Sequence, residues 1–237
     1  MKKILGISMA LFFVQTLTFA QKLPADSIFA SYFKATGGKS LWDGIKSYNL
    51  KRSYTAAAAT PYDANISVSV PEQSIYKSKN IMKRSFVYTV KGNQGWIKVP
   101  LGSKIDVKDL SQAEQENMRF EIYDNLAPFI NYKNRGFIAT TVGTETLNGV
   151  QVNQVELQGK GIKYNLYFDA KTGLMVRQKE TSAGVETVSD FSNYAKSAYG
   201  ILLPSKIVEV NSVDKKPVTI TSSATVNESI SPTLFVR

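Results

Sequence analysis

The chain has 237 residues, with 29 Lys and Arg against 19 Asp and Glu, and it contains neither histidine nor cysteine. These two absences exclude Ser–His–Asp and Cys–His catalysis, zinc sites made of His or Cys, haem ligation by His, and disulfide bonds. The formal charge of +10 is spread over short pairs such as Lys51-Arg52 and Lys83-Arg84. Nucleic-acid binding needs a continuous basic face, so we expect no nucleic-acid partner.

The first twenty residues have the pattern of a secretory signal peptide. Lys2 and Lys3 precede an apolar run from Ile4 to Leu17, and the small residue Ala20 follows. Such a run is shorter than a membrane-spanning helix. We therefore expect cleavage after Ala20 and a mature chain, residues 21–237, in the periplasm without a lipid anchor. A buried core helix or a retained interfacial anchor is the alternative.

Two helices are expected at the start of the mature chain. Pro24 suits a first helical turn, and the next apolar residues lie three to four positions apart, namely Ile28, Phe29, Tyr32 and Phe33. Gly37-Gly38 can adopt the left-handed conformation that ends a helix. A second, short helical turn follows within residues 41–45.

Alternating apolar residues from Ser47 onward predict short strands about every ten residues, separated by Asn, Gly and Lys turns. In the first strand one face carries Tyr48, Leu50, Arg52 and Tyr54. Asn148-Gly149 is the strongest hairpin signal of the chain. A later strand presents Tyr164, Leu166 and Phe168 on one face.

One long amphipathic helix interrupts the strands. Ser111 and Glu114 have the spacing of a capping box, and Met118, Ile122, Leu126 and Phe129 then repeat at helical spacing. Pro128 is expected to end or kink this helix. Its apolar stripe must rest on another surface of the protein.

These elements predict one mainly β (α+β) domain, an antiparallel meander of about ten or eleven strands. A twisted sheet of this size curls partly or wholly into a barrel, and the concave face is the apolar surface on which the helices can rest. Incomplete filling would leave an apolar cleft that binds apolar ligands. The same residues could also fill a solid core.

Several segments resemble the LolA/LolB-type outer-membrane lipoprotein carrier superfamily, in particular its lipoprotein-sorting-like envelope proteins. The similar segments are residues 32–47 around Gly37-Gly38, Val70-Pro71 with Tyr76, residues 92–102 around Trp96, residues 167–177, and residues 227–235. The resemblance implies an incomplete antiparallel β-barrel with helices covering the concave face, which holds acyl chains or other lipids. One departure is Val70, where the carriers have an Arg before the Pro that helps to hold the lid closed.

The residues expected to bind the ligand come from the inward faces of the strands and from the central helix. They are Tyr48, Leu50, Arg52, Trp96, Met118, Ile122, Leu126, Phe129, Tyr164, Leu166 and Phe168. Each apolar member could instead be ordinary core. Arg52, a charge on an otherwise apolar face, could meet a ligand head group or hold the lid in place of the Arg absent at Val70, or it could reach solvent.

The function expected from the sequence is therefore a periplasmic binding or carrier protein for lipid or lipoprotein acyl chains. It needs no catalytic residue, metal or cofactor, and we expect a monomer that contacts an envelope membrane or receptor transiently. The alternative is a non-catalytic envelope interaction module with a plugged core. A hydrolase would need two carboxylates, or Ser with Lys, converging in a pocket, and no such pair is evident.

Overall fold

A computed structural model describes residues 22–57 and 59–237. The predicted signal peptide, residues 1–20, lies outside the described residues. Among the helices of the described chain, none is both long and apolar enough to cross a membrane.

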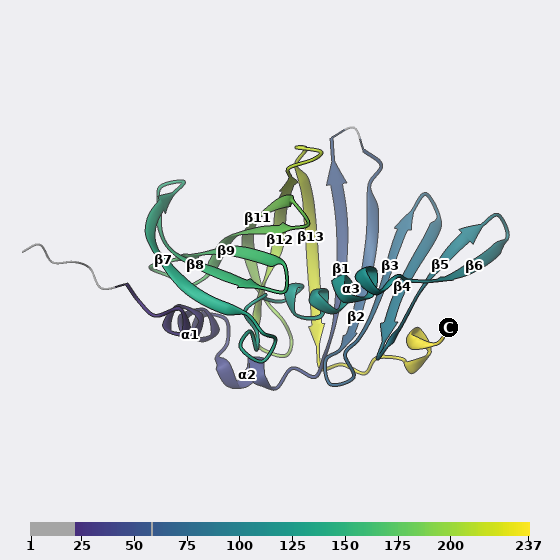
Figure 1. The fold of residues 1–237 in the computed structure, drawn as a ribbon, viewed down its shortest axis with the longest axis horizontal. Helices are drawn as coiled ribbons and strands as arrows, with labels where there is room; N and C mark the ends of the chain where they lie inside the picture. Colours follow the sequence, from purple (N-terminus) through teal and green to yellow (C-terminus); the bar gives the residue numbers. More distant parts are fainter. Residues whose placement is uncertain (1–21, 58) are drawn as a thin grey trace, which may run out of the picture.

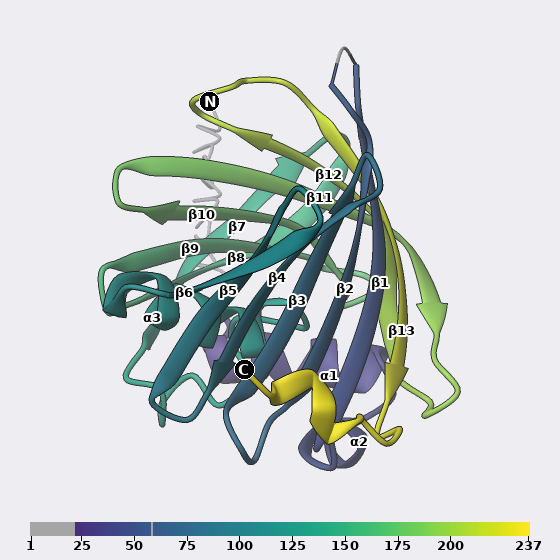
Figure 2. The ribbon, with the colours of Figure 1, turned by 90° about the vertical axis from the view of Figure 1, so that its right-hand side faces the viewer.

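All strands belong to one antiparallel sheet, in the order β6-β5-β4-β3-β2-β1-β13-β12-β11-β10-β9-β8-β7. Two meanders, β1 to β6 and β7 to β13, join where β1 pairs with β13. The edge strands β6 and β7 are not paired with each other, so the sheet curls without closing, as Figures 1 and 2 show. The predicted incomplete barrel is confirmed. The strands are β1 (Ser47–Ala56), β2 (Tyr62–Ser69), β3 (Ser74–Ile81), β4 (Arg84–Lys91), β5 (Gln94–Leu101), β6 (Lys104–Asp109), β7 (Ile138–Leu147), β8 (Val150–Gly159), β9 (Ile162–Asp169), β10 (Met175–Ser182), β11 (Val185–Lys196), β12 (Leu202–Asn211) and β13 (Val218–Val226).

The helices are α1 (Ala25–Ala35), α2 (Lys39–Asp43), α3 (Gln112–Asp124) and the short 3-10 helix η1 (Pro232–Phe235). The first two lie at one end of the curled sheet, and α3 crosses in front of β1 to β4 (Figure 1). The predicted capping box opens α3, because Glu114 N donates to Ser111 Oγ and Ser111 N donates to Glu114 Oε2. The helix ends at Asp124, so Leu126 and Phe129 lie in the loop that follows it.

An aromatic cluster fills the end of the sheet near α1. Phe29 stacks on Phe129 with ring centroids 4.4 Å apart, and Phe168 packs edge-on against both rings at 5.9 and 5.6 Å. Tyr32 adds a fourth ring 5.2 Å from Phe129. These four rings form one packed cluster between α1, the loop after α3 and β9.

The described chain has 13 strands, whereas ten or eleven were predicted. The strand that the pattern did not indicate is β6, which hairpins with β5 at the edge of the sheet. Its two β-branched residues, Ile105 and Val107, are 68% and 37% exposed. Because neither face of β6 is buried, its apolar positions do not mark it as part of the core.

Candidate functional site

The concave face of the sheet and α3 border a partly open cavity with a volume of ≈ 850 Å³, within the usual range for ligand sites. Strands β1 to β4 form one wall, β10 to β13 form the other, and α3 with the loop after it forms the cover. Apolar side chains from all three surfaces line it, namely Leu50, Tyr88, Met118, Leu126, Met175, Phe191, Leu203, Ile207 and Ile220. The interior between the two walls is therefore not filled by the side chains of the sheet.

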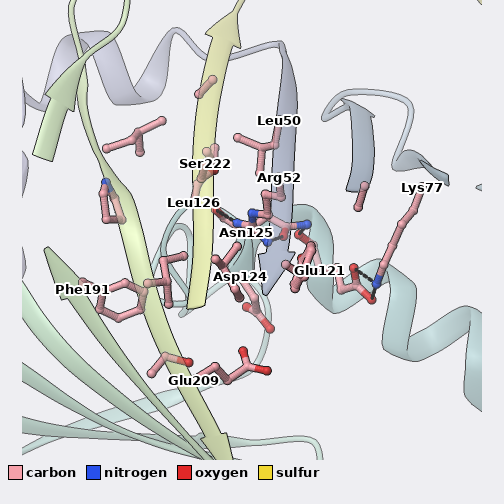
Figure 3. Close-up of a pocket in the computed structure, with 18 of the residues that line it drawn as sticks. Leu50, Arg52, Lys77, Glu121, Asp124, Asn125, Leu126, Phe191, Glu209 and Ser222 are labelled. Atoms are coloured by element: carbon pink, nitrogen blue, oxygen red, sulfur yellow. Dashed lines mark hydrogen bonds and ion pairs between the residues drawn. The ribbon is translucent and has the colours of Figure 1, made fainter. Parts of the chain in front are cut away.

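Arg52 fixes the C-terminal end of α3 to the sheet. Its Nη1 donates to Asn125 Oδ1 at 2.8 Å and its Nη2 to the Asn125 carbonyl oxygen at 3.3 Å. Figure 3 shows the two side chains meeting in the centre of the cavity. The side chain points inward, as its strand face predicted, and its observed contact is with the cover. Its Nε is buried without a partner.

Two further strand side chains hold the same helix. The Tyr48 hydroxyl donates to the Ile122 carbonyl oxygen at 2.8 Å, and complete burial raises the pKa of Tyr48 far above its usual value. Lys77 Nζ lies 2.9 and 2.8 Å from the two carboxylate oxygens of Glu121 (Figure 3). Strands β1 and β3 thus both contact the last turn of α3.

The other half of the sheet reaches the cover through Asp124. The Tyr164 hydroxyl donates to Asp124 Oδ2 at 2.6 Å, and Arg135 Nη2 lies 3.3 Å from Oδ1. Burial raises the pKa of Asp124 to about 6, although Arg135 and Tyr164 both oppose this shift. The end of α3 is therefore tied to both halves of the open sheet.

Four of the predicted site residues line the cavity, namely Leu50, Arg52, Met118 and Leu126. Tyr48, Tyr164, Leu166 and Phe168 are buried in the surrounding core. Ile122 and Phe129 are also core residues, and with Leu126 they line a second hollow of ≈ 890 Å³ between α1, α2 and residues 122–134. Leu126 thus separates the cavity from this second hollow.

Trp96 does not line the cavity. It pairs across the strands with Thr89, whereas its neighbour Ile97 pairs with Tyr88 and packs against the concave core. Because successive side chains alternate between faces, Trp96 lies on the outer face, where it is 2% exposed. The segment around η1 packs over the same face, which is also visible in Figure 2.

The wall from β10 to β13 was not predicted to bind ligand. It includes the polar residues Gln178, Glu180, Ser189 and Glu209 beside the apolar Phe191 and Ile207. Strand alternation places these residues on one face, but no local pattern tells which of two mixed faces turns inward. Among the described residues, no three acidic side chains are arranged to hold a metal ion.

The arrangement was compared with solved structures. A LolA superfamily protein from Nitrosomonas europaea superposes with a TM-score of 0.59 over 91% of this chain and 98% of that one, at 14% identity. The chain has the LolA-type fold. A domain named as an outer membrane lipoprotein-sorting protein, from Vibrio parahaemolyticus, shares it with a TM-score of 0.58, 12% identity and coverage of 88% and 94%.

A protein of the DUF1329 family from Desulfovibrio piger also has the LolA-type fold, with a TM-score of 0.59, 11% identity and coverage of 90% and 97%. No protein-family model and no curated protein matches the sequence. The resemblance noted from the sequence is thus confirmed at the level of the fold. At these identities the likeness extends to the architecture alone.

Proposed function

We propose that this protein is a non-catalytic periplasmic carrier that binds the acyl chains of lipids or lipoproteins. The observation that carries the proposal is the ≈ 850 Å³ cavity between the concave sheet and α3. The LolA-type fold of the solved relatives, one of them named for lipoprotein sorting, supports it. The predicted secretory signal supports the periplasmic location.

Hydrophobic burial alone supplies a useful affinity. Burying about eight methylene groups at ~0.8 kcal/mol each contributes ~6 kcal/mol, which corresponds to a dissociation constant on the order of 50 µM. Ordering of the cover reduces this value, and polar contacts to the head group increase it. A carrier that must release its ligand suits such an intermediate affinity.

Native mass spectrometry of protein purified from cell envelopes, with titration of a fluorescent fatty-acid analogue, tests the proposal. Ala224 lies on the cavity wall in β13, so Ala224→Trp should fill the cavity and abolish binding. The matched control is Thr221→Trp, an exposed site on the outer face of the same strand. Equal binding by wild type and Ala224→Trp, with the fold intact, would refute the proposal.

The alternative function is a non-catalytic interaction module of the envelope with a plugged interior. The observation that favours it is the aromatic cluster of Phe29, Tyr32, Phe129 and Phe168, which fills the α1 end of the sheet. If Ala224→Trp binds no analogue but retains full function in the cell, the interaction module is the better description.

The proposed carrier acts as a monomer with transient partners. Without Lys2 and Lys3 the formal charge of +10 becomes +8, which favours brief contact with an anionic membrane leaflet or an acidic receptor. Binding to anionic vesicles that weakens as ionic strength rises would support this contact.

A further inference from the structure

The β10–β12 wall of the cavity carries a row of polar side chains. Gln178 is paired across the strands with Ser189, and Ser189 is paired with Glu209. Side chains that face each other in this way are about 5 Å apart, so the three form one continuous strip, which we call the polar row. All three line the cavity.

The polar row lies at the wall of the cavity. Gln178 and Ser189 are each only 8% exposed, and the fully buried side-chain atoms without a hydrogen-bond partner belong to other residues of the described chain. Buried polar groups normally have partners. The side chain of Gln178 lines the cavity, where the polar head group of a ligand can bond to its amide.

Carboxylates flank the row on its own wall, and the positive charges of Arg52 and Lys77 act on Glu209 from the opposite wall. Glu180 lies two positions beyond Gln178 on the same strand face and also lines the cavity. Burial raises the pKa of Glu180 to about 7, and the neighbouring carboxylates of Asp124, Glu209 and Glu121 raise it further. No ion pair of Glu180 or Glu209 is present among the described residues. The opposite wall differs, since Lys77 is paired with Glu121.

An apolar row lies directly beside the polar row. Phe191 is paired across the strands with Ile207, and Ile207 with Ile220. Phe191 is two positions from Ser189 and Ile207 two positions from Glu209, which is about 7 Å along each strand. The wall therefore changes from apolar to polar along the strands, with the apolar row nearer the end where Leu202 N bonds to Thr36 O beside α1.

We propose that the cavity binds an amphiphile with a positively charged ammonium head group, held by Glu180, Glu209 and Gln178, with its alkyl chain along Phe191, Ile207 and Ile220. This inference rests on the proposed carrier function and specifies its ligand class. An ammonium group supplies both hydrogen-bond donors and a positive charge to Glu180 and Glu209, neither of which has an ion-pair partner among the described residues. An anionic head group would add a negative charge beside Glu180 and Glu209.

The test uses four amphiphiles with the same twelve-carbon chain, titrated calorimetrically below their micelle concentrations. They are dodecylammonium, dodecyltrimethylammonium, dodecyl maltoside and dodecanoate. We expect dodecylammonium to bind at least about tenfold more tightly than dodecanoate or the maltoside, the equivalent of one charge-assisted hydrogen bond. Dodecyltrimethylammonium, which has the charge but no donor, should be intermediate.

Variants test whether the β10–β12 wall causes the preference for dodecylammonium. Glu180→Gln with Glu209→Gln should lower the affinity for dodecylammonium by about tenfold or more and leave that for the maltoside unchanged. Gln178→Met, which keeps the side-chain length, should weaken dodecylammonium alone. The control is Glu186→Gln, an exposed residue on the outer face of β11. Circular dichroism verifies that each variant is folded.

The outcomes separate this inference from the carrier function. If all four amphiphiles bind equally, or if dodecanoate or the maltoside binds most tightly, the ammonium site is refuted and the carrier function stands. If none of them binds, both are refuted. An ammonium preference that survives the double substitution also refutes the assignment to this wall.

Discussion

At the scale of single residues, Arg52 points into the cavity, as the alternation of its strand predicts. Its strand face is otherwise made of Tyr48, Leu50 and Tyr54, and its guanidinium ends on Asn125, just beyond α3. A charged donor on a buried acceptor contributes more than a neutral one. The inward Arg therefore acts as a tether of the cover over the cavity.

Replacing Arg52 by Met keeps the apolar stem and removes both donors to Asn125. We expect the free energy of unfolding to fall by about 1–3 kcal/mol, because the Asn125 groups lose their partner. Hydrogen exchange of residues 122–126 should become faster. Lys51→Met, on the exposed outer face of the same strand, serves as control. Unchanged exchange at residues 122–126 would show that Arg52 is not a tether.

The carboxyl group of Glu180 makes stability depend on pH. Its pKa is raised from 4.5 to about 7 by burial, then by Asp124, Glu209 and Glu121. The folded state therefore binds this proton more tightly than the unfolded state, so wild type loses stability as pH rises between these two values. Glu180→Gln cannot ionise and should avoid that loss.

Thermal unfolding of wild type and Glu180→Gln from about pH 5 to about pH 8 measures this effect. We expect the variant to gain melting temperature relative to wild type as pH rises, with no gain at the acidic end. Glu186→Gln, exposed on β11, should show no such trend. A constant difference at every pH would mean that Glu180 does not titrate in this window.

At the scale of elements, the capping box of α3 links local sequence to the cover of the cavity. Ser111→Ala removes the acceptor of the Glu114 amide and should lower the free energy of unfolding by about 1 kcal/mol. Because α3 covers the cavity, ligand should also dissociate faster, as stopped-flow release of a fluorescent fatty-acid analogue can measure. Ser103→Ala, exposed in the turn between β5 and β6, is the control. Unaltered stability and release would show that the capping box does not stabilise the cover of the cavity.

Elements with a local signal were predictable from the sequence. The capping box of α3, the glycines after α1 and the Asn148-Gly149 turn all act through neighbouring residues. In that turn both residues have positive φ, 50° and 81°, as its hairpin type requires. Strand β6 lacked a signal because its two apolar residues, Ile105 and Val107, are exposed on one face of an edge strand.

The lining of the cavity depends on pairings between distant residues, which no local pattern shows. Gln178 lies abreast of Glu209 only because β10, β11 and β12 pair in one register. Likewise, strand alternation places Trp96 and Ile97 on opposite faces of the sheet. It does not show that the segment around η1 covers and buries the outer face. The inward face of β1 was predicted because it carries large apolar side chains.

At the scale of the whole molecule, the end of α3 joins the two halves of an open sheet. Lys77 holds it from the β1–β6 half through Glu121, and Tyr164 holds it from the β7–β13 half through Asp124. The beginning of α3 rests on β5, where an ideal Cβ at Gly95 would lie 2.5 Å from Gln115 Cγ. Entry of a ligand between α3 and the sheet would require some of these contacts to separate.

A disulfide between positions 95 and 115 tests whether α3 must move. The two Cβ atoms would be within about 4 Å, inside the span of a disulfide, and the chain has no other cysteine. In the Gly95→Cys, Gln115→Cys variant, oxidation should slow uptake and release of a fluorescent fatty-acid analogue by about tenfold or more, since opening would break a covalent bond. Reduction should restore both rates, and wild type should not respond to the reductant. Equal rates in the oxidised and reduced variant would mean that ligand passes through the open side of the sheet and that α3 is a fixed wall.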